Sequence, residues 1–94
     1  MRYSKTNLTK IETILKSQGY SIRYEKGNFS PAYCLLNSKK VIVVNKFLDL
    51  RQRIDSFCQI ATEIDPIDFT VLESDDIGFW NEVVQRSTQL KLVA

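Results

Sequence analysis

The residues of this chain best suited to chemistry are two cysteines and two groups of carboxylates, because histidine is absent. Without an imidazole there is no histidine general base, no Ser-His or Cys-His pair and no histidine-ligated zinc. The carboxylates that could transfer protons or bind a hard cation are Glu63, Asp65, Asp68, Asp75 and Asp76. All lie beside expected helix ends, where acidic residues act as caps, and none has the spacing of a calcium-binding loop. We therefore expect no catalytic residue, no metal site and no cofactor.

The two thiols are the remaining candidates for reactivity. Cys34 and Cys58 lack CxxC spacing and lie in apolar contexts, so we expect both to be reduced and buried as small hydrophobic residues. The alternative is an enzyme that uses one of these thiols as a nucleophile. The three glycines are scattered, so no glycine-rich phosphate-binding loop is expected.

Five polar residues are the candidates for a binding surface. They lie near expected turns and near the ends of strands or a helix, where loops carry function. Capping or simple solvation is the alternative for each of them. The predicted binding residues are Asn28, Tyr33, Asn45, Lys46 and Arg53.

The segment that must position most of these residues spans 33–64 and contains both strand and helix patterns. The run Val41–Val44 is β-branched throughout, which is typical of a strand. The pattern then changes to apolar residues on one face of a helix, and Asp49 can serve as its N-cap. We expect this helix to end near Ile64, and its apolar residues are Leu50, Ile54, Phe57, Cys58, Ala61 and Ile64.

The rest of the chain supplies further regular elements. Residues 5–18 predict a helix capped by Thr6 or Ser4 and ended by Gly19. Alternation over 20–26 predicts a strand that buries Tyr20, Ile22 and Tyr24. Two more strands, 32–36 and 41–45, are expected to be joined by a tight turn near 37–39.

The last third of the chain is expected to be helical. Asp65-Pro66 is expected to stop the preceding helix and to cap a new turn, with a short helix over 66–73. A final helix is then expected to open at Ser74. That helix is apolar on two sides, so either it is deeply packed or part of it contacts a second subunit. Residues 90–93 either extend it or dock as a strand.

These elements predict a single α+β domain over 1–94, in the order α-β-β-β-α-α. We expect a three-stranded antiparallel meander packed against helices. No apolar run approaches the ~20 residues of a membrane span, and the first residues lack the apolar core of a secretory signal. The expected location is the cytoplasm.

Charge is distributed unevenly along the chain. Residues 1–53 carry 11 Lys and Arg against 3 Asp and Glu, a net of +8, whereas residues 54–94 carry 2 against 8, a net of −6. The two halves either fold together and mix their charges or leave a basic face for nucleic acid. That face would be made of Arg23, Lys26, Lys39, Lys40, Lys46, Arg51 and Arg53.

Residues 19–54, from G-Y-S-I-R-Y through V-I-V-V-N-K-F-L-D-L-R-Q-R-I, resemble a short bacterial protein family of unassigned function. That resemblance implies a compact cytoplasmic protein and no known reaction. The order of strand, acidic-capped link and helix is also similar to zincin-like metallopeptidases, whose helix carries H-E-x-x-H. Matching the helix at Arg53 puts Cys58, Gln59 and Thr62 at the zinc-ligand and base positions. This likeness implies a fold relative without hydrolytic activity.

Three functions follow as hypotheses. The leading one is a small non-catalytic cytoplasmic module that acts through protein–protein contacts, with self-association as a homodimer. The second is a nucleic-acid-binding accessory protein that uses the basic face. The third is a degenerate relative of the metallopeptidases. No membrane partner is expected.

Overall fold

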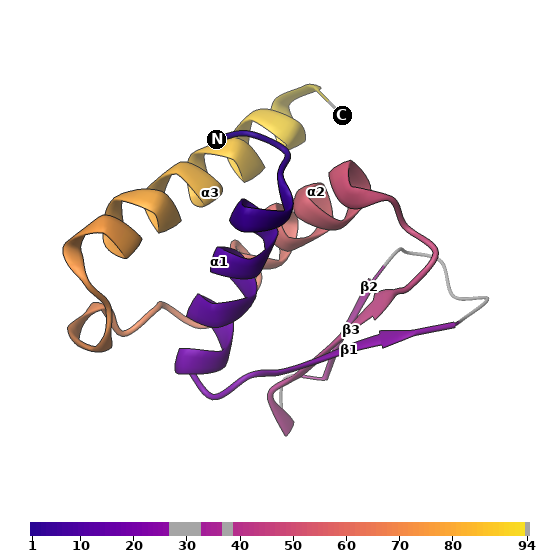
Figure 1. Cartoon of the computed structure of the whole chain (residues 1–94), viewed down its shortest axis with the longest axis horizontal. Helices are drawn as coiled ribbons and strands as arrows, with labels where there is room; N and C mark the ends of the chain where they lie inside the picture. The colour runs from indigo at the N-terminus through magenta and orange to yellow at the C-terminus, as the bar shows by residue number, and fades with distance from the viewer. Residues whose placement is uncertain (27–32, 37–38, 94) are drawn as a thin grey trace.

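The computed structural model describes residues 1–26, 33–36 and 39–93, with side chains described as far as Ser87. Three helices and a three-stranded sheet form one α+β domain, as predicted (Figure 1). The elements in chain order are α1 (Lys5–Ser17), β1 (Ser21–Glu25), β2 (Tyr33–Leu36), β3 (Val41–Asn45), α2 (Leu50–Ile60), the 3₁₀ turn η2 (Phe69–Val71) and α3 (Ser74–Val93).

Local signals fix both ends of α1. Of the two predicted N-caps, Ser4 holds the position, and its hydroxyl accepts from the amide of Asn7 at 3.1 Å. At the other end Gly19 adopts a φ of 90°, and the amides of Gly19 and Tyr20 donate to Lys16 and Leu15. This pair of bonds is a Schellman motif, which turns the chain directly into β1.

The sheet is mixed, so the predicted antiparallel meander is wrong. The strand order is β1-β3-β2, with β1 parallel to β3 and β2 antiparallel to β3. The prediction assumed that strands adjacent in sequence would pair, which fails for β1. The densest β-branched run is the central strand, where it pairs on both sides and buries Ile42 and Val44 completely.

A capping box starts α2 at the predicted residue. The Asp49 carboxylate accepts from the amide of Gln52 at 2.8 Å, and the Gln52 side chain accepts from the amide of Asp49 at 3.0 Å. The helix ends at Ile60, four residues before the predicted Ile64. The amides of Thr62 and Glu63 bond three residues back, to Gln59 and Ile60, which tightens the chain out of the helix.

The chain between α2 and α3 forms less helix than predicted. Asp68, rather than Asp65, caps the 3₁₀ turn by accepting from the amide of Thr70. The Gln18 side chain exchanges two hydrogen bonds with the backbone of Asp68 and ties this link to the end of α1. Residues 90–93 extend α3, the first of the two predicted alternatives.

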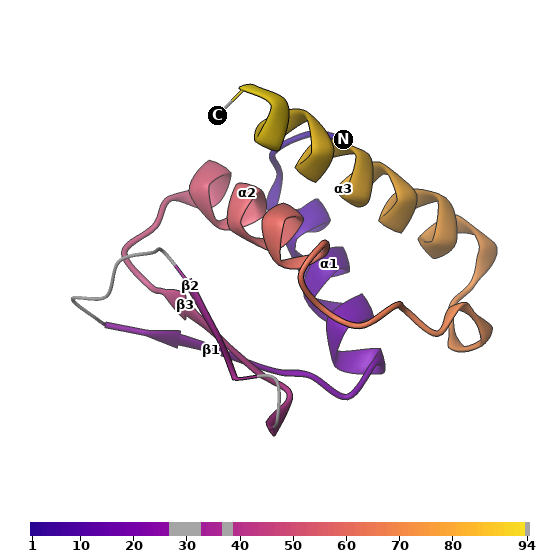
Figure 2. The same cartoon turned by 180° about the vertical axis from the view of Figure 1, so that it is seen from behind.

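The helices lie on one side of the sheet (Figures 1 and 2). α1 and α2 pack between the sheet and α3, and Phe57 of α2 is the largest fully buried side chain among the described residues. Both apolar sides of α3 contribute to this core, so neither requires a second subunit. The buried apolar residues are Leu8, Ile11, Ile14, Leu15, Tyr20, Ile42, Val44, Ile54, Phe57, Cys58, Ile60, Phe79, Trp80 and Val83.

Among the described residues, no helix combines the length and the apolar character that a membrane crossing requires.

Candidate functional site

A groove of about 430 Å³ opens where α1, the end of β1 and the start of α2 meet. It lies at the carboxyl ends of the parallel strands β1 and β3, the position where open sheets commonly bind ligands. Its volume is within the range of small-molecule and peptide pockets. The residues that line it are Lys5, Leu8, Thr9, Glu12, Tyr24, Leu48, Leu50 and Arg53.

Three polar side chains from three elements converge in this groove. The Tyr24 hydroxyl donates to a carboxylate oxygen of Glu12, and the guanidinium carbon of Arg53 lies 4.7 Å from the centre of the Tyr24 ring. Burial of the phenol, followed by the hydrogen bond to Glu12, raises the pKa of Tyr24 well above its usual value. Tyr24 therefore keeps its proton at neutral pH and acts as a donor and a stacking surface.

The link between β3 and α2 fixes Arg53. Its Nε donates to the carbonyl of Leu48 at 3.0 Å, and its Nη2 donates to the carbonyl of Lys46 at 2.7 Å. The side chain of Asn45 accepts from the amide of Phe47 at 3.0 Å and shapes the same link. Three of the predicted binding residues, Asn45, Lys46 and Arg53, are thus brought together in this link, and of the three Arg53 lines the groove. Asn45 has a structural role there.

The remaining two predicted binding residues, Asn28 and Tyr33, have different outcomes. Asn28 lies outside the described residues. Tyr33 belongs to β2, on the far side of β3 from β1, and its hydroxyl donates to Glu63 at 2.8 Å. Partial burial, followed by the bond to Glu63, raises the pKa of Tyr33 to about 12. This contact joins the sheet to the chain just after α2.

Glu12, Tyr24 and Lys5 are groove residues that the sequence reasoning missed. Lys5, Thr9 and Glu12 recur at helical spacing on the flank of α1, next to the buried stripe that includes Leu8. The helical spacing of this flank can be read from the sequence. The sequence does not say which strand the flank faces.

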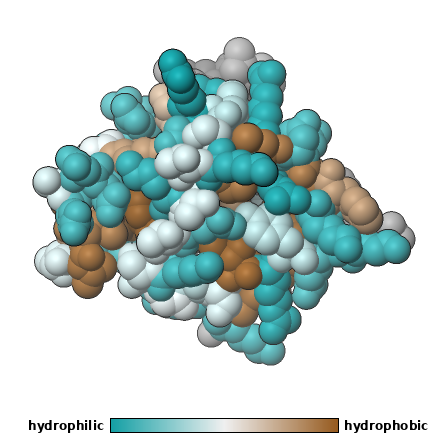
Figure 3. Space-filling model, in the orientation of Figure 1, coloured by the Kyte–Doolittle hydropathy of each residue, from teal (hydrophilic) through white to brown (hydrophobic). Residues whose placement is uncertain are grey.

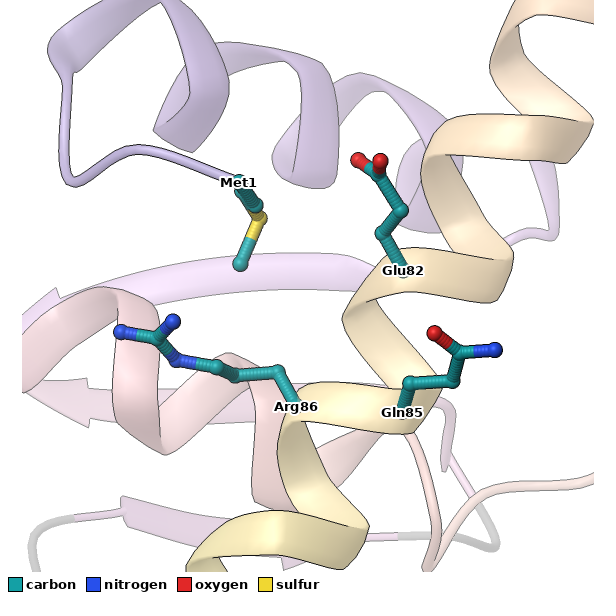
Figure 4. Close-up of a pocket in the computed structure, with 4 residues that line it drawn as sticks. All are labelled: Met1, Glu82, Gln85 and Arg86. Carbon is teal, nitrogen blue, oxygen red and sulfur yellow. The ribbon is translucent and has the colours of Figure 1, made fainter.

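A second, smaller pocket of about 180 Å³ lies between the N-terminal segment and α3. Met1, Glu82, Gln85 and Arg86 line it (Figure 4). Arg86 and Gln85 point in different directions from α3 in that view. The Arg86 guanidinium instead stacks 4.5 Å from the ring of Tyr3, whose hydroxyl donates to Asp55 at 2.6 Å. These contacts join the N-terminal segment to α2 and α3, and the four lining side chains do not converge on a ligand position.

The face of the sheet opposite the helices has an apolar centre. Cys34 and Leu36 of β2 pair with Val43 and Val41 of β3, and both β2 residues are exposed. The prediction of a buried Cys34 is therefore wrong. Alternation along β2 places Cys34 on the face that no described helix covers. We call Cys34, Leu36, Val41 and Val43 the uncovered face.

Other exposed apolar residues lie outside this face. Phe47, in the link before α2, is 67% exposed, and the Lys46 amine lies 5.5 Å from its ring centre. Phe69 and Val71 of η2 are also exposed, and apolar surface is visible on that side of the molecule in Figure 3.

The residues proposed for a basic face are spread over the molecule. Lys39 and Lys40 precede β3 and Lys46 follows it, so the strand separates them by roughly 20 Å. Arg51 stacks near Tyr3, away from Arg53. Tyr20, just before β1, is buried, and Tyr24 of β1 faces the helices, so these aromatics do not form an exposed platform for stacking bases.

The thiol of Cys58 is fully buried, as predicted. Burial, followed by the charge of Asp55, raises the pKa of Cys58 to about 12, so this sulfur is poorly suited to act as a nucleophile. The Thr62 hydroxyl donates to the carbonyl of Gln59 at 2.8 Å. Within residues 1–26, 33–36 and 39–93, no group of three or more Cys, Asp or Glu side chains has an arrangement that could hold a metal.

No protein-family model matches the chain, and neither the curated proteins nor the solved structures include a significant match.

Proposed function

We propose that this protein is a non-catalytic protein-contact module that associates with a second copy of itself through the uncovered face. The observation that supports this is the apolar centre formed by Val41, Val43, Cys34 and Leu36. A sheet with one solvated face normally alternates apolar and polar residues, with the polar set facing water. Apolar residues in cross-strand pairs on the solvent side are instead typical of a contact surface.

Charge at the border of this face favours a second copy as the partner. Arg23 and Glu25 lie on the same side of β1, 3.8 Å apart, and more than half of each side chain is exposed. One cation and one anion form a self-complementary pair under a two-fold axis, since Arg23 of each copy can meet Glu25 of the other. Such exposed pairs add little affinity, but they set the orientation.

The size of the face sets the strength of the dimer. Three strands of four or five residues offer much less than the ~800 Å² per partner of a stable interface. We therefore expect a weak and reversible dimer, populated only at high micromolar concentration.

Thiol crosslinking tests this arrangement. Cys34 lies within the uncovered face and is exposed, whereas Cys58 is fully buried. A bismaleimide crosslinker should yield covalent dimers from the native chain and none from Cys34→Ser. Analytical ultracentrifugation at 20 to 500 μM, as an order-of-magnitude range, should show a monomer–dimer equilibrium.

Matched lysine substitutions locate the interface. Val43→Lys and Leu36→Lys should each abolish the dimer, while Thr13→Lys, an equal charge change on the exposed side of α1, should leave it intact. Circular dichroism confirms that each variant is folded. A monomer throughout the concentration range, or a dimer that survives both lysines, would contradict the proposal.

We also infer a cytoplasmic location. Cys34 is an exposed free thiol and Cys58 is unpaired. Unpaired thiols are typical of a reducing compartment. Fractionation of source cells with an antibody against the protein tests this, and recovery from the medium would contradict it.

A further inference from the structure

The outer edge of β1 offers backbone groups for pairing. The amide of Ser21 donates to Lys40, and the carbonyl of Glu25 accepts from Lys46, so alternate residues of β1 face β3. The residues between them, Ile22 and Tyr24, direct their N–H and C=O groups to the opposite side. Among the described strands, β3 is the only one that pairs with β1.

Tyr24 connects this edge to the groove. Its backbone faces the outer edge, while its ring lines the groove beneath the guanidinium of Arg53. A strand added to β1 would lie ~4.8 Å away from it. Its side chains on the helix side would then meet the flank of α1, where Thr9 and Glu12 lie.

The charges around the groove favour an acidic occupant. Lys5 and Arg53 line it, and Lys46 follows β3 at the same end of the sheet. Glu12 is the one carboxylate among the lining residues, where it accepts from Tyr24, so the two cations outnumber it; nearby Glu25 is paired with Arg23. Leu8, Leu48 and Leu50 add apolar surface to the lining of the groove.

We propose that an extended acidic segment of a partner protein adds to the edge of β1 as a fourth strand. Its backbone pairs with Ile22 and Tyr24. An acidic side chain contacts Lys5 and Arg53, and an apolar one enters the groove between Leu48 and Leu50. Main-chain pairing supplies affinity in this mode, while the groove supplies selectivity. The proposal is independent of the dimer, since it uses the edge and the groove and leaves the uncovered face free.

Titration with designed peptides tests the proposal. The probe is a fluorescein-labelled hexapeptide of alternating glutamate and valine, which should bind with a Kd below about 100 μM. A lysine–valine peptide should bind at least tenfold more weakly. The glutamate peptide methylated on alternate backbone nitrogens should lose binding to the same extent, because it cannot donate to the edge. No binding at 1 mM, or equal binding of all three peptides, would overturn the proposal.

Protein variants assign the contact. Lys5→Gln should weaken binding of the glutamate peptide about twofold to fivefold, whereas Lys16→Gln, the same change near the end of α1 and outside the groove, should not. In ¹⁵N NMR spectra the peptide should shift the amides of residues 22–25. Val43→Lys should bind the peptide normally, which separates this test from that of the dimer. An equal effect of the two lysine changes would overturn the proposal.

Two further outcomes would assign the edge to another occupant. Displacement of the peptide by an equimolar single-stranded oligonucleotide would identify a general polyanion site and overturn the proposal. Self-association that is lost in Lys5→Glu and retained in Val43→Lys would show that β1 pairs with β1 of a second copy, which would also overturn it.

Discussion

Val43 and Val44 are adjacent in β3, yet they belong to two very different surfaces. Val44 is completely buried against the helices, while Val43 lies on the uncovered face and is partly exposed. Both are valines in the same central strand, so the difference in their burial arises from what covers each face of the sheet. It teaches that one strand can serve the core and a contact surface at once, provided that the helices cover only one face.

The groove side and the uncovered face also differ in how their polar groups are held. Arg53 donates to two backbone carbonyls and stacks on Tyr24, and Tyr24 in turn donates to Glu12. Arg23 and Glu25 have only a 3.8 Å ion pair near solvent. We expect the first set to be rigid and the second to rearrange when a partner arrives.

The largest expected effect separates the two faces of β3. Val44→Ala should lower the free energy of unfolding by about 2 kcal/mol, because it removes buried methyl groups from a packed core. Val43→Ala, the matched change on the uncovered face, should cost less than about 1 kcal/mol in the monomer. Urea unfolding at low protein concentration measures both changes in the free energy of unfolding. Equal losses would show that the two faces of β3 do not differ in packing.

The next effect is the pH dependence of the free energy of unfolding, which reports on Cys58 in the core. The pKa of Cys58 is raised in the folded state to about 12, whereas the unfolded thiol titrates near its usual value of 9.0. The stability from this protonated thiol is therefore complete below about pH 9 and is lost as pH rises towards the folded pKa. We expect a loss of about 1 kcal/mol between pH 8 and pH 10.

The control for this pH effect is the second thiol. Urea unfolding at pH 8, 9 and 10 should show a smaller loss in Cys58→Ala than in the native chain. Cys34→Ala, on the uncovered face, is the matched variant. A loss reduced equally by both substitutions would show that burial in the core is not its cause.

The smallest effect concerns polar contacts at the ends of the two surfaces. Asp49→Ala removes the N-cap that starts α2 beside the groove and should cost about 1 kcal/mol. Arg23→Ala breaks the exposed ion pair of β1 and should cost less than about 0.5 kcal/mol. Thermal unfolding compares the two variants, and a larger cost for Arg23→Ala would mean that the uncovered face is already organised in the monomer.

Local features of the fold were predictable from the sequence. Gly19 and Asp49 act within one helical turn of their own positions, so a short segment contains all the information needed to place them. The N-cap of α1 was left open between Thr6 and Ser4, and the structure selects Ser4. The helix over Ser74–Val93 was also predictable in its start, although its two apolar sides left its partner open. In the structure α3 packs against α1 and α2.

The candidate site was predictable only in part. Arg53 was identified because it lies near the start of a helix, and Lys46, identified near the end of a strand, contributes the carbonyl that accepts from Arg53. Glu12 and Tyr24 were missed, since each looks like an ordinary helix or strand residue until α1 is placed over β1. The exposed position of Cys34 was missed for a related reason, because alternation gives two faces and does not say which one the helices cover.

The sequence by itself determined where the helices start, which segments are strands and which residues alternate between two faces, because these depend on hydrogen bonds and periodicity within a few residues. Tertiary structure decided that β3 is central, that β1 runs parallel to it, and that Val43 faces outward while Val44 faces inward. Those outcomes depend on which distant surfaces bury one another most completely, and that is a property of the whole chain.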